Sequence, residues 1–88
     1  MTVMTMAGKK TRDGIKLAKI VKMLELLPGV EVRSGTKHPY VARFDGARPC
    51  PIATSTDAKT MLTPWVADVT GMKKASIYSS FKDGTWYN

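Results

Sequence analysis

The sequence predicts an α+β fold, in which a small antiparallel sheet of three strands is packed by two helices and followed by a short extra C-terminal helix. Three observations indicate this α-β-β-β-α order. Residues 15–27 have the apolar spacing of an amphipathic helix, residues 30–54 contain three short strand-like runs, and a helical pattern returns after residue 57. With 88 residues, the chain is expected to form one domain, since it is too short to bury two separate cores.

The first helix is expected over residues 15–27. Its apolar residues recur at intervals of three and four, and they are Ile15, Leu17, Ala18, Ile20, Val21, Leu24 and Leu27. Asp13 is expected to be the N-cap of this helix, and Pro28-Gly29 to end it. Cations lie on the opposite side, at Arg12, Lys16, Lys19 and Lys22. The helix is therefore expected to bury one face and to expose a basic one.

Three short strands are expected to follow the helix. Residues 30–33 alternate apolar and polar side chains, and residues 40–44 are aromatic and β-branched. Asp45-Gly46 is a dipeptide favoured in two-residue hairpin turns, with Gly46 as the flexible turn residue. Residues 48–54 return as the third strand, and their two prolines predict that it lies at an edge of the sheet.

A two-residue turn also predicts the register of this hairpin. It pairs Phe44 with Ala47, Arg43 with Arg48, Ala42 with Pro49 and Val41 with Cys50. Two arginines directly opposite each other are unfavourable unless an anion lies between them, and a phosphate is the natural candidate. A three-residue turn would shift the register and remove this argument. Cys50 is expected to be a small packed hydrophobic residue.

The second half of the chain is expected to be helical. In residues 57–70, either Pro64 starts a helix that Thr63 caps, or it bends a longer helix; Gly71 is the expected C-cap. Residues 72–82 are expected to form a third short helix. Its candidate buried residues are Ala75, Ile77, Tyr78 and Phe81.

The charge of the chain is strongly positive and unevenly distributed. Fourteen Lys and Arg residues against seven Asp and Glu residues give a net charge of +7. Residues 1–24 contain six cations and one carboxylate, a local excess of five, whereas residues 25–58 are neutral. A concentrated basic surface is typical of proteins that bind polyanions, nucleic acids before membranes. The alternative is a solvated face that only keeps the protein in solution.

Composition argues against several classes of protein. Cys50 and His38 are the only residues of their types, so we expect no disulfide within the chain and no protein-built metal site. No glycine-rich phosphate loop is visible, and no cofactor is expected. The apolar runs are far shorter than the ~20 residues of a membrane-spanning helix, and the N-terminal residues do not form a secretory signal. These features together predict a cytoplasmic protein.

One segment contains the residue best suited to chemistry, and its sequence is Ser34-Gly35-Thr36-Lys37-His38-Pro39-Tyr40. Gly35 permits a tight turn, and Lys37 adds a cation. The imidazole of a histidine such as His38 titrates near neutrality, at a pKa of ~6.5, and can both donate and accept a proton. The alternative is a surface histidine without a role.

In the order of its elements and in these residues, the chain resembles the HicA-type toxins of bacterial toxin–antitoxin pairs. The resemblance covers about residues 15–71. It consists of the helix that ends in Pro28-Gly29, the strand Val30 to Arg33, the Gly-Thr-x-His pattern of Gly35 to His38, the hairpin Arg43 to Arg48, the strand with Pro51, and the closing helix up to Gly71.

This resemblance implies a double-stranded-RNA-binding-like fold and an mRNA interferase activity, with His38 as the catalytic residue. RNA and an antitoxin protein are the implied partners. His38 would act as general base toward a ribose 2′-OH or as general acid toward the leaving 5′-oxygen, without a metal. The expected phosphate-binding cations are Lys37, Arg43 and Arg48 together with Arg12, Lys16, Lys19 and Lys22.

The pattern of residues and the resemblance together give the expected organisation of the chain. Residues 1–10 are expected to be a flexible arm, in which Met4 or Met6 could be the true start. Residues 11–71 form the HicA-like domain, and residues 72–88 are a C-terminal extension beyond the usual end of the family.

Two departures from the family pattern leave other functions open. Pro39 directly follows His38, and the further histidine that many members carry after the third-strand proline is missing. The alternatives are a non-catalytic RNA-binding module and a basic, phage-encoded interaction protein with an acidic partner. The aromatic residues that could stack on bases are Trp65, Trp86, Tyr78 and Tyr87, although core packing is the better interpretation for Trp65 and Tyr78.

Overall fold

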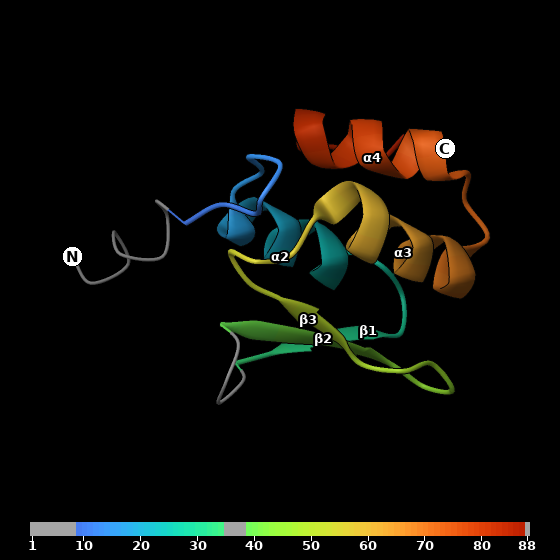
Figure 1. The fold of residues 1–88 in the computed structure, drawn as a ribbon. Helices are drawn as coiled ribbons and strands as arrows, with labels where there is room; N and C mark the ends of the chain where they lie inside the picture. The colour runs from blue at the N-terminus through green and yellow to red at the C-terminus, as the bar shows by residue number, and fades with distance from the viewer. Residues whose placement is uncertain (1–8, 35–38, 88) are drawn as a thin grey trace.

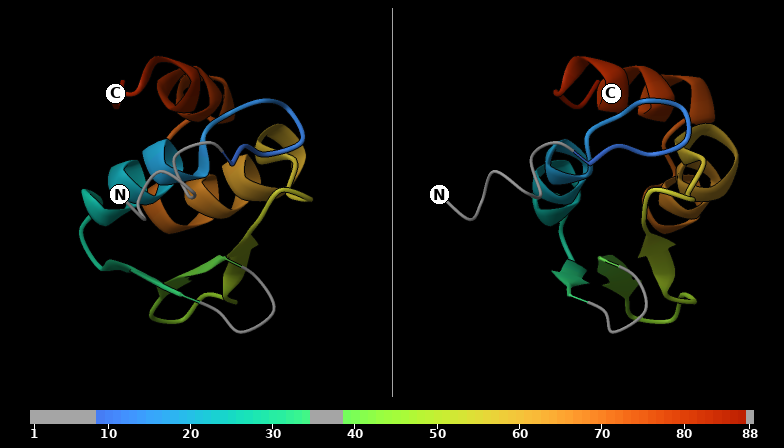
Figure 2. Two further views of the ribbon diagram at one scale, coloured as in Figure 1. Left: turned by 90° about the vertical axis from the view of Figure 1, so that its left-hand side faces the viewer. Right: turned by 60° about the vertical axis from the view of Figure 1, so that its left-hand side comes forward.

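The computed structural model describes residues 9–34 and 39–87 and has the expected α+β class, with three antiparallel strands in the order β1-β2-β3 (Figure 1). The sheet forms one layer, α2 and α3 cover one of its faces, and α4 lies on the far side of these two helices (Figures 1 and 2). No helix in the described ranges is long and apolar enough to cross a membrane. The elements are α2 (Leu17–Glu25), β1 (Val30–Arg33), β2 (Tyr40–Phe44), β3 (Cys50–Ile52), the π-helix η1 (Ala58–Leu62), α3 (Thr63–Thr70) and α4 (Lys74–Asp83).

The first helix is shorter than expected, and the prediction that Asp13 is its N-cap is wrong. Lys16 occupies the N-cap position of α2, and its side chain makes no capping hydrogen bond. Residues 10–16 form a compact loop instead, closed by a β-bridge between Lys10 and Lys16 and by a hydrogen bond from the Thr11 amide to the Ile15 carbonyl. Gly14, at a φ of +86°, permits this reversal of the chain. The loop places Asp13 over the start of η1.

The strands lie where the sequence predicts them, but the register of the second hairpin differs. Ala42 pairs with Cys50, and Tyr40 pairs with Ile52, one residue away from the expected pairing. Five residues connect the two strands, with a turn closed by the Ala47 amide and the Phe44 carbonyl. In this register Cys50 and Ile52 both point into the core, where they are 6% and 0% exposed. A shift by one residue would turn both apolar side chains to the opposite face.

This register overturns the expected pairing of Arg43 with Arg48. The ladder between β2 and β3 pairs Ala42 with Cys50 and leaves Arg48 outside it, so no anion between two arginines is needed. On its other side, Arg43 pairs with Glu31 of β1. The third strand is an edge strand, as its prolines predict, and Pro51 lies on its exposed side. Cys50 is buried opposite Ala42, in agreement with its expected role as a packed hydrophobic residue.

The π-helix η1 runs directly into α3. Asp57 caps η1 by accepting a hydrogen bond from the Lys59 amide. The Thr63 amide donates to the carbonyl of Ala58, five residues earlier, and Pro64 follows in the first turn of α3. Because proline has no amide proton, the wide turn ends where the next donor is missing. Thr63 is therefore part of the helix and not its N-cap, whereas Gly71 is the C-cap, as expected.

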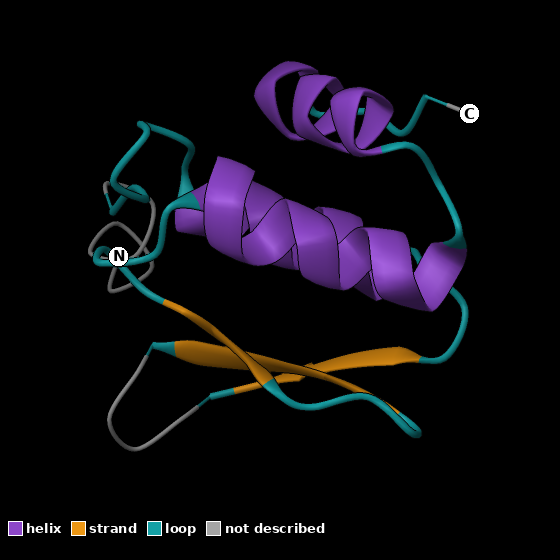
Figure 3. Cartoon of the chain, turned by 45° about the vertical axis from the view of Figure 1, so that its right-hand side comes forward, coloured by secondary structure: helices purple, strands orange, loops and turns teal. Residues whose placement is uncertain are grey.

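The last helix belongs to the same hydrophobic core as α2 and α3. Ile77 and Phe81 are fully buried, but Ala75 is exposed, so its predicted burial is wrong. Residues 77 and 81 are four apart and share one helix face, whereas residue 75 lies about 200° around the helix from residue 77. The Trp86 ring packs edge-on against Phe81, and its indole donates to the Met23 carbonyl of α2 at 2.8 Å. Figure 3 shows α4 closing over the other helices.

Candidate nucleic-acid interface

The structure separates the predicted phosphate-binding residues into groups. Lys19 is half-buried on α2, whereas the exposed members of the predicted set are Arg12, Lys16, Lys22, Arg43 and Arg48. His38, Lys37 and Gly35 lie outside the described residues. In the chain they fall between the end of β1 at Arg33 and the start of β2 at Tyr40. Gly46 has a φ of +86° in the β2–β3 turn, in agreement with its role as the turn residue.

The open face of the sheet carries partly balanced charges. Arg33 forms an exposed ion pair with Glu31, with a nitrogen–oxygen distance of 3.1 Å. Arg43 pairs across the strands with the same glutamate. Arg48 lies beyond the turn, where its backbone carbonyl accepts a 2.6 Å hydrogen bond from the Trp65 indole. This bond joins the β2–β3 connection to α3. Trp65 is partly buried and packs against the hydrophobic core, as the sequence predicts.

Lysines gather instead on the helical side, around a cavity of about 290 Å³ that we call the lysine cavity. Three separate segments contribute to it: the loop of residues 10–16, the start of α2 and the end of α4. The residues that line the cavity are Lys10, Asp13, Gly14, Ile15, Lys16, Lys19 and Lys82. Four of these seven residues are cations, which makes the cavity suited to an anion.

The lysine cavity is held together by contacts between its three segments. The Lys19 ammonium donates a 3.0 Å hydrogen bond to the backbone carbonyl of Lys82, which joins α2 to α4. The Leu17 amide donates to the Lys9 carbonyl, and the Arg12 amide donates to the Thr56 carbonyl. These backbone bonds fix the loop of residues 10–16 against both α2 and the segment that precedes η1.

Asp13 is the one carboxylate that lines the lysine cavity, and both of its oxygens already accept hydrogen bonds. Its oxygens accept from the Thr11 hydroxyl at 2.7 Å, the Ala58 amide at 3.0 Å, the Lys59 amide at 3.1 Å and the Tyr78 hydroxyl at 2.9 Å. Partial burial disfavours the ionised form, but these bonds outweigh it and lower the pKa of Asp13 to about 2. The carboxylate therefore stays ionised and holds the loop on η1 and α4.

A second cavity of about 440 Å³ lies between α4 and the helices η1 and α3, and we call it the Tyr78 cavity. The residues that line it are Lys59, Thr63, Lys74, Ala75, Tyr78 and Ser79. The ammonium groups of Lys82 and Lys59 lie 5.0 and 6.0 Å from the centroid of the Tyr78 ring. Burial, and then the hydrogen bond to Asp13 and the negative charges of Asp13 and Asp57, raise the pKa of Tyr78, so its hydroxyl remains a donor.

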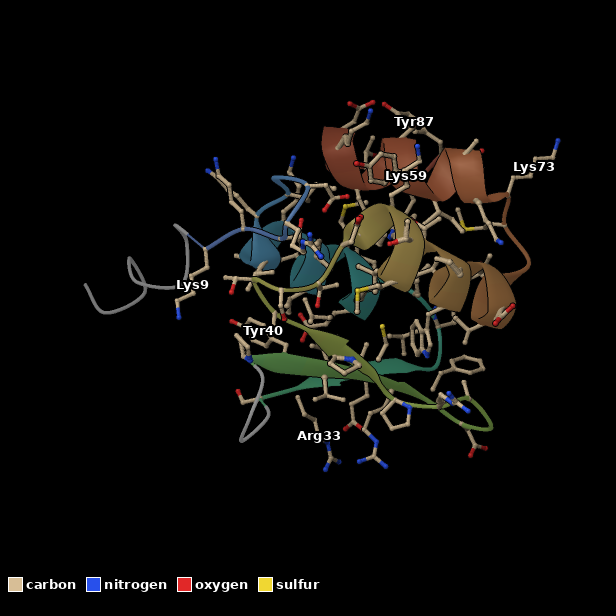
Figure 4. The ribbon with its side chains drawn as sticks, in the orientation of Figure 1. Lys9, Arg33, Tyr40, Lys59, Lys73 and Tyr87 are labelled. Carbon is tan, nitrogen blue, oxygen red and sulfur yellow. The ribbon has the colours of Figure 1, made fainter. Side chains whose placement is uncertain are left out.

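The two cavities are connected by contacts between the residues that line them, although no residue lines both. Tyr78 lines the Tyr78 cavity, and its hydroxyl is bonded to Asp13 of the lysine cavity. Lys82 lines the lysine cavity and places its ammonium near the Tyr78 ring. Figure 4 shows Lys59 over the helical layer and Arg33 on the opposite side, beyond the sheet.

Sequence reasoning identified Lys16 and Lys19 at this site but missed the other cations. Lys82 lies in the expected third helix, yet nothing in its local sequence shows that this helix packs beside residues 10–19. The missed lysines are Lys10, Lys59, Lys74 and Lys82. Lys22 is exposed in the last turn of α2 and does not line either cavity.

In the described part of the chain, no three His, Cys, Asp or Glu residues lie close enough together to hold a metal ion. Comparison of the chain with models of protein families, with characterised proteins and with solved structures finds no significant match.

Proposed function

We propose that this protein binds RNA and cleaves it as a metal-independent endoribonuclease of the HicA type. The observation that supports this function best is the α-β-β-β-α order, with β1 and β2 on either side of Gly35-Thr36-Lys37-His38. The net charge of +7 and the lysines of the helical side agree with a polyanionic substrate.

The reaction uses the nucleophile that RNA itself supplies. His38 accepts the proton of the ribose 2′-OH next to the scissile phosphate, or donates a proton to the leaving 5′-oxygen. The 2′-oxygen forms a bond to phosphorus as the bond to the 5′-oxygen breaks, which leaves a 2′,3′-cyclic phosphate and a 5′-hydroxyl end. With one histidine in the chain, the second proton passes through water or a cation.

The cations are assigned to different phosphates of the RNA according to their positions in the chain. Lys37 is adjacent to His38 in the sequence and is assigned to the scissile phosphate. Arg43 lies three residues along β2 from Tyr40, a distance of about 10 Å. Arg43 and Arg48 are therefore assigned to phosphates that flank the cut. In this proposal the protein acts in the cytoplasm, and an antitoxin protein covers the active residues.

The test is a cleavage assay with purified protein in EDTA. Wild-type protein should cut RNA and leave 2′,3′-cyclic phosphate ends, and substrates with 2′-O-methyl groups at the cut site should resist. His38→Ala should reduce the rate by ~10²–10⁴-fold, and His38→Gln, which cannot exchange a proton, should be nearly as slow. Both variants should unfold at the wild-type temperature. An active His38→Gln protein, or cleavage lost in EDTA and restored by Mg²⁺, would contradict the mechanism.

A second candidate is RNA binding without cleavage. It is favoured by the position of the lysine cavity, which is lined by residues of the loop 10–16, α2 and α4 and by none of the sheet. Salt-sensitive RNA binding by a wild-type protein that leaves RNA intact would support this function. In that case Pro39, which restricts the backbone of His38, is the first residue to replace.

A further inference from the structure

We propose that the lysine cavity and the Tyr78 cavity together form a groove for single-stranded RNA, in which phosphates occupy the first and an unstacked base occupies the second. This inference rests on the RNA binding proposed above and deepens it. It assigns a role to α4, which lies beyond the part of the chain that resembles HicA-type toxins.

The lysine cavity has the charge and the donors that a phosphodiester requires. Lys10 and Lys16 are exposed, and Lys19 uses one of its three ammonium protons on the Lys82 carbonyl. The ionised carboxylate of Asp13 offsets one of the four lysine charges, which leaves the lining of the cavity with an excess of positive charge. Four donors already engage its oxygens, so they do not compete for the lysine ammonium groups. The hydrogen bond to the Lys82 carbonyl already orders the side chain of Lys19, so this lysine loses less entropy when an anion binds.

The Tyr78 cavity has the size and the lining that a base requires. Its volume of about 440 Å³ falls within the range of small-ligand pockets. The Tyr78 ring supplies an aromatic surface, and Ala75 and the side chain of Thr63 supply the rest of the wall. Two ammonium groups lie near this ring, Lys82 at 5.0 Å from its centroid and Lys59 at 6.0 Å, the outer limit of contact, so a stacked base replaces at least one of them. The exposed side chain of Lys59 can move aside for a base and contact the adjacent phosphate.

The two cavities together distinguish single-stranded RNA from other polyanions. In a duplex, bases are stacked and paired and cannot enter the Tyr78 cavity, whereas a single strand can turn a base outward. A polypeptide of acidic residues alone, such as polyglutamate, matches the lysines but has no planar ring for the cavity beside them. Single-stranded RNA satisfies both halves of the groove.

The experiment measures binding of a short fluorescent single-stranded RNA in which every ribose is 2′-O-methylated, so that the probe cannot be cut. The groove variant is Lys16→Gln with Lys82→Gln, and the control variant is Arg33→Gln with Lys73→Gln, which removes the same charge from exposed positions elsewhere. The groove variant should bind more weakly at every salt concentration. Its slope of log affinity against log salt should fall by about 1.4, or ~0.7 for each phosphate that a lysine no longer neutralises. The control variant should keep the wild-type slope.

Variants of Tyr78 test whether a base stacks on its ring. Tyr78→Ala should weaken binding by roughly 5- to 100-fold, the typical effect of removing the ring on which one base stacks. Tyr78→Phe also removes the hydrogen bond to Asp13 but keeps the ring, so it should bind RNA like the wild type. This pair separates stacking from stability, and thermal unfolding of each variant gives the fraction of folded protein.

Any of three outcomes would contradict the groove proposal. The groove and control variants could have equal salt slopes, or the protein could bind the single strand and its matched duplex with equal affinity. Polyglutamate could also compete with the probe as effectively as unlabelled single-stranded RNA does. Failure of the endoribonuclease is distinguishable from failure of the groove. Suppose that the protein binds the 2′-O-methyl strand through Lys16, Lys82 and Tyr78 but does not cut natural RNA. The groove proposal then stands, and the catalytic proposal is wrong. If the protein cuts RNA but its groove variants bind normally, only the groove proposal is wrong.

Discussion

The hydroxyl of Tyr78 donates a 2.9 Å hydrogen bond to the carboxylate of Asp13, 65 residues earlier in the chain. Asp13 also accepts from the Ala58 and Lys59 amides, and therefore acts as a cap for η1, a helix far from it in sequence. One carboxylate thus joins the loop of residues 10–16, η1 and α4. The loop and α4 contribute to the lysine cavity, and η1 and α4 contribute to the Tyr78 cavity, so Asp13 is expected to determine the stability and the shape of both.

Replacement of Asp13 by alanine is expected to destabilise the protein by about 3 kcal/mol. The change removes the acceptor of four hydrogen bonds and leaves two backbone amides without that partner, and bonds to a charged group contribute ~1.5–3 kcal/mol each without adding fully. Urea unfolding followed by tryptophan fluorescence measures the effect. Asp68→Ala, at an exposed position of α3, is the control and should change the unfolding free energy by about 0.5 kcal/mol or less. Equal effects of the two changes would contradict this role.

The stability of the protein should also depend on pH through Asp13. Its pKa of about 2 in the folded protein lies below the ordinary value of 3.8, so ionised Asp13 favours the folded state. This contribution, about 2 kcal/mol, is complete above pH 4 and is lost as the pH falls through 2. Urea unfolding at a series of pH values should show the free-energy difference between wild type and Asp13→Asn shrinking as the pH falls below 4. Parallel curves over this range would rule out the linkage.

Gly29 is expected to tolerate substitution less well than Gly14, although both have a positive φ, of +81° and +86°. A β-carbon at Gly29 would lie 2.8 Å from Cε1 of Phe44, whereas one at Gly14 meets nothing within 4 Å. Backbone strain costs ~1–2 kcal/mol in both variants. Gly29→Ala should lose about 1 kcal/mol more, because the Phe44 ring must move. Chemical unfolding of the two alanine variants measures the difference, and similar values would show that Phe44 moves freely.

Cys50 should be inert in the native protein. Its side chain is buried opposite Ala42, and burial raises the pKa of its thiol to about 11. At pH 8 only about one thiol in a thousand is then ionised, and the thiolate is the reactive form. A chromogenic disulfide reagent should modify the folded protein far more slowly than the urea-unfolded protein. Equally fast modification in both states would show that the β2–β3 hairpin opens readily.

The strands and the ends of the later helices could be predicted because their signals are local. The alternation of Val30 to Arg33, the prolines of the edge strand and the C-cap at Gly71 each reflect the preferences of a few neighbouring residues. The register of the β2–β3 hairpin could not be predicted in this way, since the five-residue connection and the burial of Cys50 and Ile52 determine it jointly.

The candidate site was predictable only in part, for a related reason. The stripe that includes Lys16 and Lys19 follows from helical spacing. The contribution of Lys82 depends on how α4 packs against α2, and this packing is a property of the folded core. The same is true of Asp13, because a local capping rule assigns it to the nearest helix, whereas the fold brings it to η1.

The contact of Trp86 with α2 has a consequence for the synthesis of the protein. The Trp86 indole reaches back 63 residues to the Met23 carbonyl and packs on Phe81. While the segment that contains Phe81 and Trp86 is still in the ribosomal tunnel, the apolar face of α2 lacks this part of its covering. The core is therefore completed only after residue 86 has emerged. Nascent chains stalled before this point should accordingly be protease-sensitive, and chains stalled after it should be resistant.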